Sequence, residues 1–512
     1  MAALSAADCL SAYAGLLASV GLTSKQREYS NLSSALQKHT LPHKLSQLLK
    51  LLDAKAAKVA TVAKQPKRRA VVAAAVVGAG PVGLRTAIEL ALIGARVEVL
   101  EAREGFSRLQ VLHLWEWVEA DLTDVGIRVL DPSIFATTDV RRCTTMQLQL
   151  SLLKIALLFG VRVRFGCKVA AESIGQLYLK RVDVLVDASG ARCPLLDSVG
   201  FGTEVALKSQ RALCIVISLI NSRTKEELME RESTWASQFY QTEFGELAKR
   251  GVPLENLVYY RSSGAFADAA THYFVMTTSA EALHGYGVLR RAVTEVEADA
   301  LCKPDNVDTT KLEAFAREGV GAFVPSLAQL PLCAGQLSIF DFSERKQSNC
   351  AAKLVSGATV GSKQDTPCIV TRVGDALQEP FWPEGLGINR GFLGAYDCAD
   401  LVLRATPLLI TPLGAPTSTP DDFGPLVERR EAIYKLIKRI SGSNRQKELR
   451  PHLDGSRKFC YTLEPGSRYV SWSEANGGRD AAALGKGSAP TAAPAAGPPR
   501  MAFHVKTVAP LR

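Results

Sequence analysis

Apolar and polar positions alternate along this chain with two different periods, and their order predicts a mixed α/β fold. The segment from Val71 to Val77 is a run of small and β-branched residues, which is typical of a strand buried on both faces. A helical period follows at Leu84, Ile88 and Leu92, and a second strand is expected from Ala95 to Leu100. Strand, helix and strand in this order predict a parallel βαβ unit.

The region before the first strand has helical periodicity up to about residue 60. One helical face gathers Leu10, Tyr13, Leu17 and Val20, and a later one gathers Leu45, Leu48, Leu49 and Leu52. Gly21 ends the first pattern, and Thr23 with Gln26 predicts a capping box for a second helix. We therefore expect helices ahead of the βαβ unit.

The same α/β pattern continues after the second strand. Met146 to Phe159 predicts an apolar helix, and strands are expected at Val161 to Phe165 and at Val182 to Val186. The pattern resumes much later, with a strand at Cys368 to Val373 and a helix after Gly385. These elements predict one nucleotide-binding sheet whose strands come from two separate parts of the chain.

A different pattern occupies the interval between those parts. From Arg211 to about Phe340, strand-like runs such as Leu213 to Ile220 and Tyr273 to Thr277 alternate with polar helices, which predicts an inserted domain with its own sheet. The expected parts are an N-terminal helical region (1–70), a nucleotide-binding domain in two pieces (71–205 and 341–476), an inserted substrate domain (206–340) and a Gly/Ala/Pro-rich tail (477–512). The tail is too poor in large apolar residues to pack, and we expect it to be disordered.

A glycine fingerprint follows the first strand. Gly78 allows a tight turn, Gly80 lets the backbone approach a pyrophosphate, and Gly83 lets the helix pack closely on the sheet. The helix N-terminus offers N–H groups and a positive dipole end to phosphate. Glu101 ends the second strand, where a carboxylate accepts hydrogen bonds from a ribose and repels a 2′-phosphate. The unit therefore suits the adenosine half of FAD or NAD, and a glycine-rich turn in another α/β domain is the alternative.

Bulk composition limits the class of protein more than it identifies the function. The chain has 512 residues, 47% of them hydrophobic and 22% charged, which is typical of a globular protein of more than one domain. Its eleven cysteines form no C-x-x-C pair, which favours a reducing compartment and argues against a structural metal. No uninterrupted apolar run is long enough to span a membrane. Asp8 argues against a secretory signal, while the Ala- and Ser-rich start leaves an organellar transit peptide open.

The formal charge of +10 allows association with an acidic partner, or it serves only solubility. Lys64 to Arg69 is a basic connector, for which a solvated linker is favoured over a nuclear signal. We expect no nucleic-acid partner.

The residues around the two nucleotide-binding segments resemble the flavin monooxygenase domain of MICAL proteins, which oxidise actin methionines. The resemblance covers about residues 8 to 472, and the calponin-homology, LIM and coiled-coil modules usual in the family do not follow. Its most specific segments are Gly78–Leu90, Val99–Arg103, Phe106–Trp115, Gln147–Gly160, Thr271–Thr277 and Val373–Leu393. The implied fold is a Rossmann-like FAD-binding domain of the p-hydroxybenzoate hydroxylase type with an inserted α+β substrate domain.

The resemblance also implies roles for individual residues. Glu101 and Arg103 would hold the adenosine part of FAD, and Arg108 its phosphate side. Val169 would contact the adenine through its backbone, Asp375 would bind the ribityl chain, and Tyr273 would line the flavin cavity. Trp382 matches an aromatic residue beside the isoalloxazine ring and is the expected catalytic residue. A core aromatic beside Phe381 is the alternative, but Pro380 and Pro383 favour a turn at the site.

Several positions depart from the family pattern. Leu109 and Gln110 stand where asparagines are usual, and only Gln110 could still donate to the flavin. Met146 stands where an arginine is common, and Ser189-Gly190 replaces an Asp-Gly motif near Arg192. About two dozen residues are missing between the strands at Arg162 and Val182, which indicates a shortened surface loop.

The activity implied by the resemblance is oxidation of protein methionine to methionine sulfoxide, with bound FAD, NADPH as cosubstrate and O₂. Actin filaments would be the substrate and would disassemble on oxidation, and hydrogen peroxide could be released. A cytoplasmic, cytoskeleton-associated monomer is expected. The alternatives are a small-molecule aromatic hydroxylase on the same fold and a flavin-binding scaffold or redox sensor with weak turnover.

Overall fold

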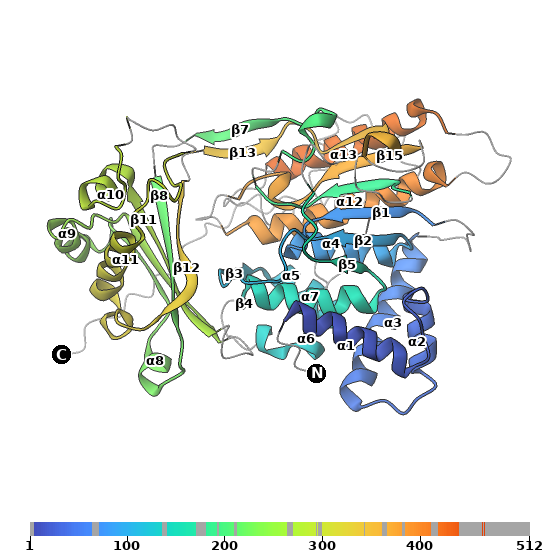
Figure 1. Cartoon of the computed structure of the whole chain (residues 1–512), viewed down its shortest axis with the longest axis horizontal. Coiled ribbons are helices and arrows are strands. Elements are labelled where there is room, and N and C mark those ends of the chain that lie inside the picture. The colour runs from blue at the N-terminus through green and yellow to red at the C-terminus, as the bar shows by residue number, and fades with distance from the viewer. Residues whose placement is uncertain are drawn as a thin grey trace, which may run out of the picture.

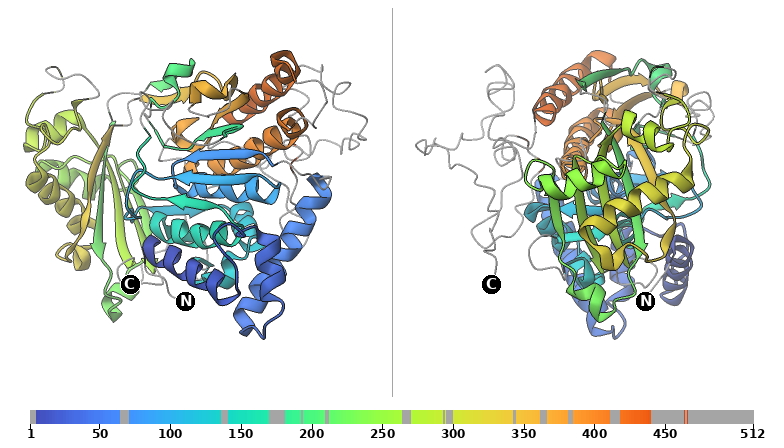
Figure 2. Two further views of the ribbon diagram at one scale, coloured as in Figure 1. Left: turned by 45° about the vertical axis from the view of Figure 1, so that its right-hand side comes forward. Right: turned by 90° about the vertical axis from the view of Figure 1, so that its left-hand side faces the viewer.

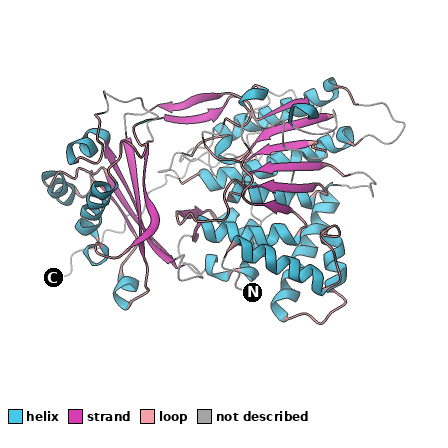
Figure 3. Cartoon of the chain, viewed as in Figure 1, coloured by secondary structure: helices cyan, strands magenta, loops and turns pink. Residues whose placement is uncertain are grey.

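The computed structural model describes residues 5–63, 71–135, 141–169, 181–191, 194–208, 212–263, 270–292, 294, 300–341, 344–360, 366–380, 385–410, 418–439, 463 and 465. The connector at 64–69, the tail at 477–512, Arg192 and Trp382 lie outside these residues. Figure 1 shows two sheets side by side, and Figure 3 marks their strands and helices.

The larger sheet has six strands in the order β14-β15-β6-β1-β2-β5. These strands are β14 (Ala352–Ser356), β15 (Pro367–Arg372), β6 (Val184–Asp187), β1 (Ala73–Val77), β2 (Arg96–Leu100) and β5 (Arg162–Arg164). All pairs are parallel except β14 with β15. The predicted βαβ unit is confirmed, since β1, helix α4 (Pro81–Leu92) and β2 follow one another and β1 pairs with β2.

Helices cover one face of this sheet. Helices α4, α7 (Thr145–Leu158), α12 (Gly387–Leu409) and α13 (Pro420–Lys438) share a hydrophobic core with alternate strand residues such as Val76 and Val99. Residues of the opposite strand face, including Val77 and Val370, pack on the segment around Leu195. The sheet is therefore buried on both faces, which explains its continuous apolar strands.

The N-terminal helices α1 (Ala6–Ser19), α2 (Tyr29–Leu36) and α3 (His43–Ala63) belong to the same core. The predicted capping box at Thr23 is wrong. The side chain of Gln26 accepts hydrogen bonds from Thr23 N and Oγ1 at 3.2 and 3.0 Å, but α2 begins only at Tyr29. The pair closes an isolated turn, because this local contact does not require a helix to follow.

The second sheet has five antiparallel strands in the order β12-β8-β11-β10-β9. They are β12 (Leu332–Asp341), β8 (Ala212–Ile220), β11 (Ala270–Ser279), β10 (Asn256–Ser263) and β9 (Ser233–Ala236). Helices α9 (Gln241–Lys249), α10 (Ala280–Tyr286) and α11 (Thr309–Phe323) cover its outer face, and its other face turns toward the parallel-sheet domain (Figure 2). The mixed fold with an antiparallel unit inserted in a parallel one is confirmed.

Two small ribbons complete the architecture. Strands β7 (Thr203–Lys208) and β13 (Glu344–Ser348) pair where the chain enters and leaves the antiparallel unit (Figure 1). Strands β3 (Val111–Leu114) and β4 (Arg141–Thr144) form an antiparallel pair between the two sheets. Helices α5 (Glu116–Asp124) and α6 (Ile127–Leu130) lie between these two strands in the sequence. A short helix, α8 (Lys225–Met229), lies between β8 and β9 in sequence. No helix in the described ranges is long and apolar enough to cross a membrane.

Candidate functional site

The carboxyl ends of the central parallel strands form one edge, where the first fingerprint lies. The register aligns Val77 with Leu100 and with Asp187, and Asp187 with Arg372. The residues that follow these four, among them Gly78 and Glu101, therefore emerge side by side. Ligands of open α/β sheets bind at this edge.

The three fingerprint glycines have distinct steric reasons. Gly78 has φ +106°, and a Cβ there would lie 2.4 Å from the carbonyl oxygen of Ala188. A Cβ on Gly83 would lie 2.1 Å from the carbonyl oxygen of Gly78, so the helix start packs directly on the turn. A Cβ on Gly80, the N-cap of α4, would meet no atom within 4 Å, and no side chain caps this helix. The loop thus leaves open space at a helix N-terminus, which suits an approaching phosphate.

Glu101 fixes the glycine loop from the neighbouring strand. Its side chain is 6% exposed, and its carboxylate accepts hydrogen bonds from Ala79 N at 2.7 Å and from Arg103 N at 3.0 Å. From the other side, Gln149 Nε2 donates to the Ala79 carbonyl at 3.0 Å. A carboxylate has about four acceptor sites, so Glu101 retains capacity for the hydroxyls of a ribose.

Charged groups connect this loop to the Gly374-Asp375 pair just after β15, which is the second fingerprint of the nucleotide site. Burial raises the pKa of Asp375 to about 6, while Arg108 and Arg390 lower it and Glu379 adds to the rise. Desolvation and Arg103 lower the pKa of Arg108, while Asp375 raises it. Arg108 and Asp375 therefore act on each other electrostatically although they lie far apart in the sequence.

Val82 joins the two fingerprints by packing. Gly374 has φ +62°, and a Cβ there would lie 3.3 Å from Val82 Cβ. A Cβ on Gly391, in α12, would lie 2.3 Å from Val82 Cγ2. The side chain from the first fingerprint thus occupies a notch formed by two glycines of the later segment. At the same place, a Cβ on Gly387 would lie 3.9 Å from Asp375 Oδ1, so the start of α12 adjoins this carboxylate.

Residues 107–110, called here the flavin loop, are held by backbone contacts to both domains. Gln336 of β12 accepts a hydrogen bond from Leu109 N at 3.2 Å and donates to the Ser107 carbonyl at 3.1 Å. At the start of α7, Met146 N donates to the Arg108 carbonyl at 2.9 Å, and Thr145 N donates to the Gln110 carbonyl at 2.9 Å. The loop is therefore clamped between α7 and the antiparallel sheet.

A patch of apolar side chains lies on the inner face of the antiparallel sheet. Tyr273 is 2% exposed and packs with Cys214 and Val216, and Val111 of β3 packs against this cluster. Burial raises the pKa of the Tyr273 phenol well above its usual value. Tyr273 therefore faces the parallel-sheet domain, on the side where the flavin cavity is expected.

An ion pair and a cation–π contact link the two domains beside the apolar cluster around Tyr273. The guanidinium of Arg142, in β4, lies 4.2 Å from the ring centroid of Tyr260 and pairs with Glu232. Between β3 and α12, Asn389 accepts from Trp115 N at 3.1 Å and donates to the His113 carbonyl at 3.3 Å. These contacts fix the position of the hairpin between the sheets.

The predicted residues fall into three groups. Gly78, Gly80, Gly83, Glu101, Arg103, Arg108, Gln110 and Asp375 surround the carboxyl edge of the parallel sheet, and Tyr273 faces it from the second sheet. The side chain of Val169 packs against the core on the sheet face opposite the helices, which leaves its predicted backbone contact to the adenine untested. Trp382 lies outside the described residues, between Pro380 and Gly385, which has φ +61°. The roles of all these residues remain predictions.

Three residues at the site were not predicted from the sequence. Gln149 lies three positions after Met146 on one helical face, and that spacing could have indicated it. Val82 occupies a variable position of the fingerprint, and Gln336 lies beside a register irregularity in β12, so neither has a local signal.

The Asp187-Ala188-Ser189 segment is organised by a buried ion pair. Asp187 accepts a hydrogen bond from Arg372 Nε at 3.3 Å and from Ser189 N at 3.1 Å, and burial raises its pKa. This aspartate is therefore engaged in the structure of the sheet edge.

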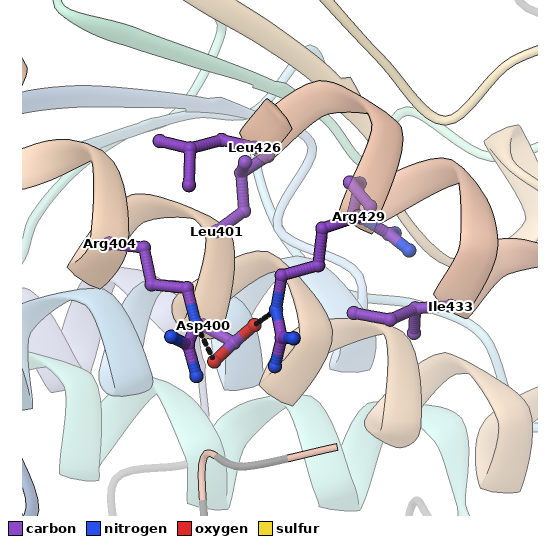
Figure 4. A pocket seen from close by; sticks show the side chains of 7 residues that line it. Asp400, Leu401, Arg404, Leu426, Arg429 and Ile433 are labelled. Carbon is purple, nitrogen blue, oxygen red and sulfur yellow. Dashed lines mark hydrogen bonds and ion pairs between the residues drawn. The ribbon is translucent and has the colours of Figure 1, made fainter. Parts of the chain in front are cut away.

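A small pocket between α12 and α13 is separate from the site. Asp400 accepts hydrogen bonds from Arg404 Nε at 2.9 Å and from Arg429 Nε at 3.2 Å (Figure 4). Asp400 lies well over three helical turns beyond Gly387, or about 20 Å along the helix at its standard rise. The cluster therefore ties two helices together away from the carboxyl edge.

Comparisons with known proteins point to one family. Residues 211–337 match the family model described as the Mical Rossman domain. The F-actin monooxygenase mical1 of Danio rerio is 32% identical over 420 residues, which covers 77% of this chain and 31% of the relative. The F-actin monooxygenase MICAL1 of Rattus norvegicus is 33% identical over 421 residues, with 77% and 36% covered. The chain thus spans about a third of the length of these relatives.

Among solved structures, p-nitrophenol 4-monooxygenase from Pseudomonas putida is similar with a TM-score of 0.44 and 15% identity, covering 74% of this chain and 92% of that one. This likeness is too loose to place any residue.

Proposed function

Since this chain contains a monooxygenase domain of the MICAL family, we propose that it binds FAD, consumes NADPH and oxidises protein methionine to methionine sulfoxide. Actin filaments are the proposed substrate, and their disassembly is the proposed outcome. The relatives support this choice, because their names describe F-actin monooxygenases and, in Danio rerio, a protein-methionine sulfoxide oxidase. The proposed location is the cytoplasm, in association with the cytoskeleton.

One observation carries the proposal: the charged and glycine residues expected to bind FAD converge at one edge of the parallel sheet. The space beside Gly80 and the uncapped start of α4 suit the pyrophosphate. Glu101 lies one strand away for the ribose, and Asp375 is partly exposed beside the start of α12 for the ribityl hydroxyls. The residues present therefore fit the cofactor.

Bound FAD would supply hydride acceptance from NADPH and activation of O₂. The protein's own task is then to bind, orient and shield. Arg108 places a positive charge near Asp375, and Gln336 holds the loop that carries it. The apolar face around Tyr273 and Val216 excludes water on the side of the second sheet. A thioether reacts through its sulfur lone pair, so no general base is required.

The experiment is NADPH consumption by the purified, FAD-loaded chain with and without F-actin, followed by mass mapping of oxidised actin methionines. We expect a yellow protein whose NADPH consumption rises with F-actin and whose product carries methionine sulfoxide. Phenols that accelerate consumption while F-actin does not would replace this proposal with an aromatic hydroxylase. The formal charge of +10 suits an acidic filament, so added salt should weaken the stimulation.

Trp382 is the proposed catalytic residue within this function. We expect Trp382→Ala to retain flavin but to lose coupled turnover, so that NADPH is consumed without sulfoxide formation. A variant with wild-type coupling would show that Trp382 lies away from the reacting atoms.

A second candidate is a flavin-binding protein with weak turnover. It is favoured by the apolar contact among Leu109, Met146 and Cys333. At Leu109 and Met146 the family resemblance implies polar residues, an asparagine and an arginine. A bound flavin that NADPH fails to reduce would support this candidate.

A further inference from the structure

Three apolar side chains meet where the flavin loop, α7 and β12 come together. Leu109 and Cys333 are each 7% exposed, and Met146, which is partly exposed, packs against both. Leu109 belongs to the flavin loop and Cys333 to the antiparallel sheet. The cluster is therefore a small apolar contact between the two domains beside the proposed cofactor site.

Met146 lies on the side of α7 that faces that site. Its N–H donates to the carbonyl of Arg108 at 2.9 Å. One turn later, Gln149 contacts the glycine loop at the Ala79 carbonyl, at 3.0 Å. Side chains three positions apart share a helix face, so Met146 and Gln149 lie on the same face of α7. Met146 also packs against the core of the parallel-sheet domain.

We propose that Met146 is a self-oxidation site of this enzyme. The proposal rests on the proposed function, which supplies peroxide at the flavin site. The thioether sulfur donates its lone pair to one oxygen of hydrogen peroxide, the O–O bond breaks, and the other oxygen leaves as water after proton transfer. Sulfur is oxidised to the sulfoxide and peroxide is reduced to water, so atoms and electrons balance.

Cys333 does not compete for this oxidant. Burial raises the pKa of the Cys333 thiol to about 11. The thiolate is the reactive form of cysteine, and at neutral pH this thiol stays protonated, whereas a thioether needs no ionisation.

The modification acts on the flavin loop. A sulfoxide is polar, and at Met146 it would be placed against Leu109 and Cys333. Loss of that contact leaves the loop attached to the second sheet chiefly through Gln336. Oxidation of Met146 therefore weakens flavin retention, and turnover without substrate limits itself.

Two other methionines serve as internal controls. Met229 on α8 is 81% exposed, and Met276 on β11 is fully buried in the core of the second sheet. Peroxide from bulk solution reacts first with the most exposed thioether, so it modifies Met229 before Met146 and spares Met276. Oxidant formed at the flavin site should instead modify Met146 before Met229.

The experiment follows oxygen incorporation at Met146, Met229 and Met276 of the FAD-loaded chain during NADPH turnover with catalase present and actin absent. Trypsin places them in separate peptides, and Met146 falls in Cys143–Lys154. We expect the Met146 peptide to be oxidised at least about three-fold more than the Met229 peptide, with the reverse order when peroxide is added to protein that is not turning over. Equal or greater oxidation of Met229 during turnover, or an unmodified Met146, overturns the proposal.

NADPH consumption, recorded in the same samples, separates this inference from the proposed function. Consumption without Met146 oxidation rejects the inference alone. If NADPH is not consumed, the bound flavin is reduced by light with EDTA and then aerated, which generates the oxidant without NADPH. An unmodified Met146 after that treatment, or a chain that binds no flavin, also rejects the inference.

A variant pair tests the consequence. Met146→Leu keeps the volume and removes the sulfur, so we expect its flavin to stay bound through prolonged turnover while the wild type releases flavin. Met229→Leu makes the same change at an exposed site and should behave as the wild type. Equal flavin release from all three proteins would show that oxidation of Met146 has no effect on the loop.

Discussion

The two fingerprints of the nucleotide site are built on different physics. At the first, Gly78 and Gly83 are required by backbone atoms 2.4 and 2.1 Å from where a Cβ would stand. At the second, the atoms nearest to a Cβ on Gly374 belong to the side chain of Val82, and the pKa of Asp375 is set by the charges and burial around it. The first fingerprint is a steric device that no pH change alters, whereas the second contains a group that titrates near neutrality.

The difference shows what each segment contributes to a bound cofactor. A rigid backbone turn gives a fixed place for a phosphate, because its donors cannot rearrange. The pKa of a partly buried carboxylate depends on the charges and hydrogen-bond donors beside it, so its protonation can change when a cofactor binds. We therefore expect substitutions of Gly78 and Gly83 to act on folding, and substitutions of Asp375 to act on FAD affinity and on its pH dependence.

The strongest test of the steric part is Gly83→Ala. Its Cβ would meet the Gly78 carbonyl oxygen, which a backbone atom cannot avoid, so the cost should exceed the about 1–3 kcal/mol typical of overpacking. Gly80→Ala is the matched control, because its Cβ meets nothing, and it should cost about 1 kcal/mol or less in stability while weakening FAD binding. Urea unfolding of the apoprotein and FAD titration measure both. A stable Gly83→Ala protein would contradict the steric account.

The notch around Val82 is tested by a double-mutant cycle. Gly391→Ala places a Cβ 2.3 Å from Val82 Cγ2 and should destabilise by about 1–2 kcal/mol net of its helix-propensity gain. In a Val82→Ala background the clash is absent, so Gly391→Ala should become neutral or stabilising. Gly394→Ala, whose Cβ would meet nothing within 4 Å on the same helix, is the control. Additive effects of Val82 and Gly391 would mean that the notch does not couple the fingerprints.

The electrostatic part is tested by the pH dependence of FAD binding. The pKa of Asp375 is about 6 in the folded apoprotein, against an ordinary value of 3.8. Between pH 3.8 and about 6, the folded protein therefore keeps a proton on Asp375 that the unfolded chain has lost. Its contribution to stability therefore falls as pH rises through that window. The ionised carboxylate accepts hydrogen bonds from the ribityl hydroxyls better than the protonated acid does. The affinity for FAD should therefore rise as the pH increases through about 6.

Two variants control this profile. Asp375→Asn should abolish the pH dependence, and Glu379→Gln should move its midpoint to lower pH, because Glu379 raises the pKa of Asp375. Flavin fluorescence across pH 5–7.5 measures both profiles. An unchanged midpoint in Glu379→Gln would show that the pH dependence of FAD binding does not arise from Asp375.

A smaller effect than that of Gly83→Ala is expected outside both fingerprints. Gln336→Ala removes two hydrogen bonds to the flavin loop and should cost about 1–2 kcal/mol in stability. Because the loop lies between the fingerprints, FAD affinity should fall without a change in its pH midpoint. A shifted midpoint would show that the loop controls Asp375, and the two segments would then not be separable.

The sequence predicted the parts of the fold that depend on local pattern. The βαβ unit, helix α7 and strands β8 and β11 lie within a few residues of their expected limits. The capping box at Thr23 failed, because two side chains can bond without a helix to follow. Gln336 was missed because its partners lie more than 220 positions away, and its orientation depends on how two domains meet. The notch around Val82 has the same origin, since it needs Gly374 and Gly391 in place.

The β7–β13 ribbon determines how separable the second sheet is. Lys208 and Glu344 pair across it, so the chain enters and leaves the antiparallel unit at adjacent points. The antiparallel unit is therefore an inserted module whose two ends are adjacent. If the module were replaced by a short turn between those ends, β6 and β15 would remain neighbours in the parallel sheet. Exchange of the module between related proteins would require two junctions, at Lys208 and Glu344, which lie side by side, and the parallel sheet would keep its strand order.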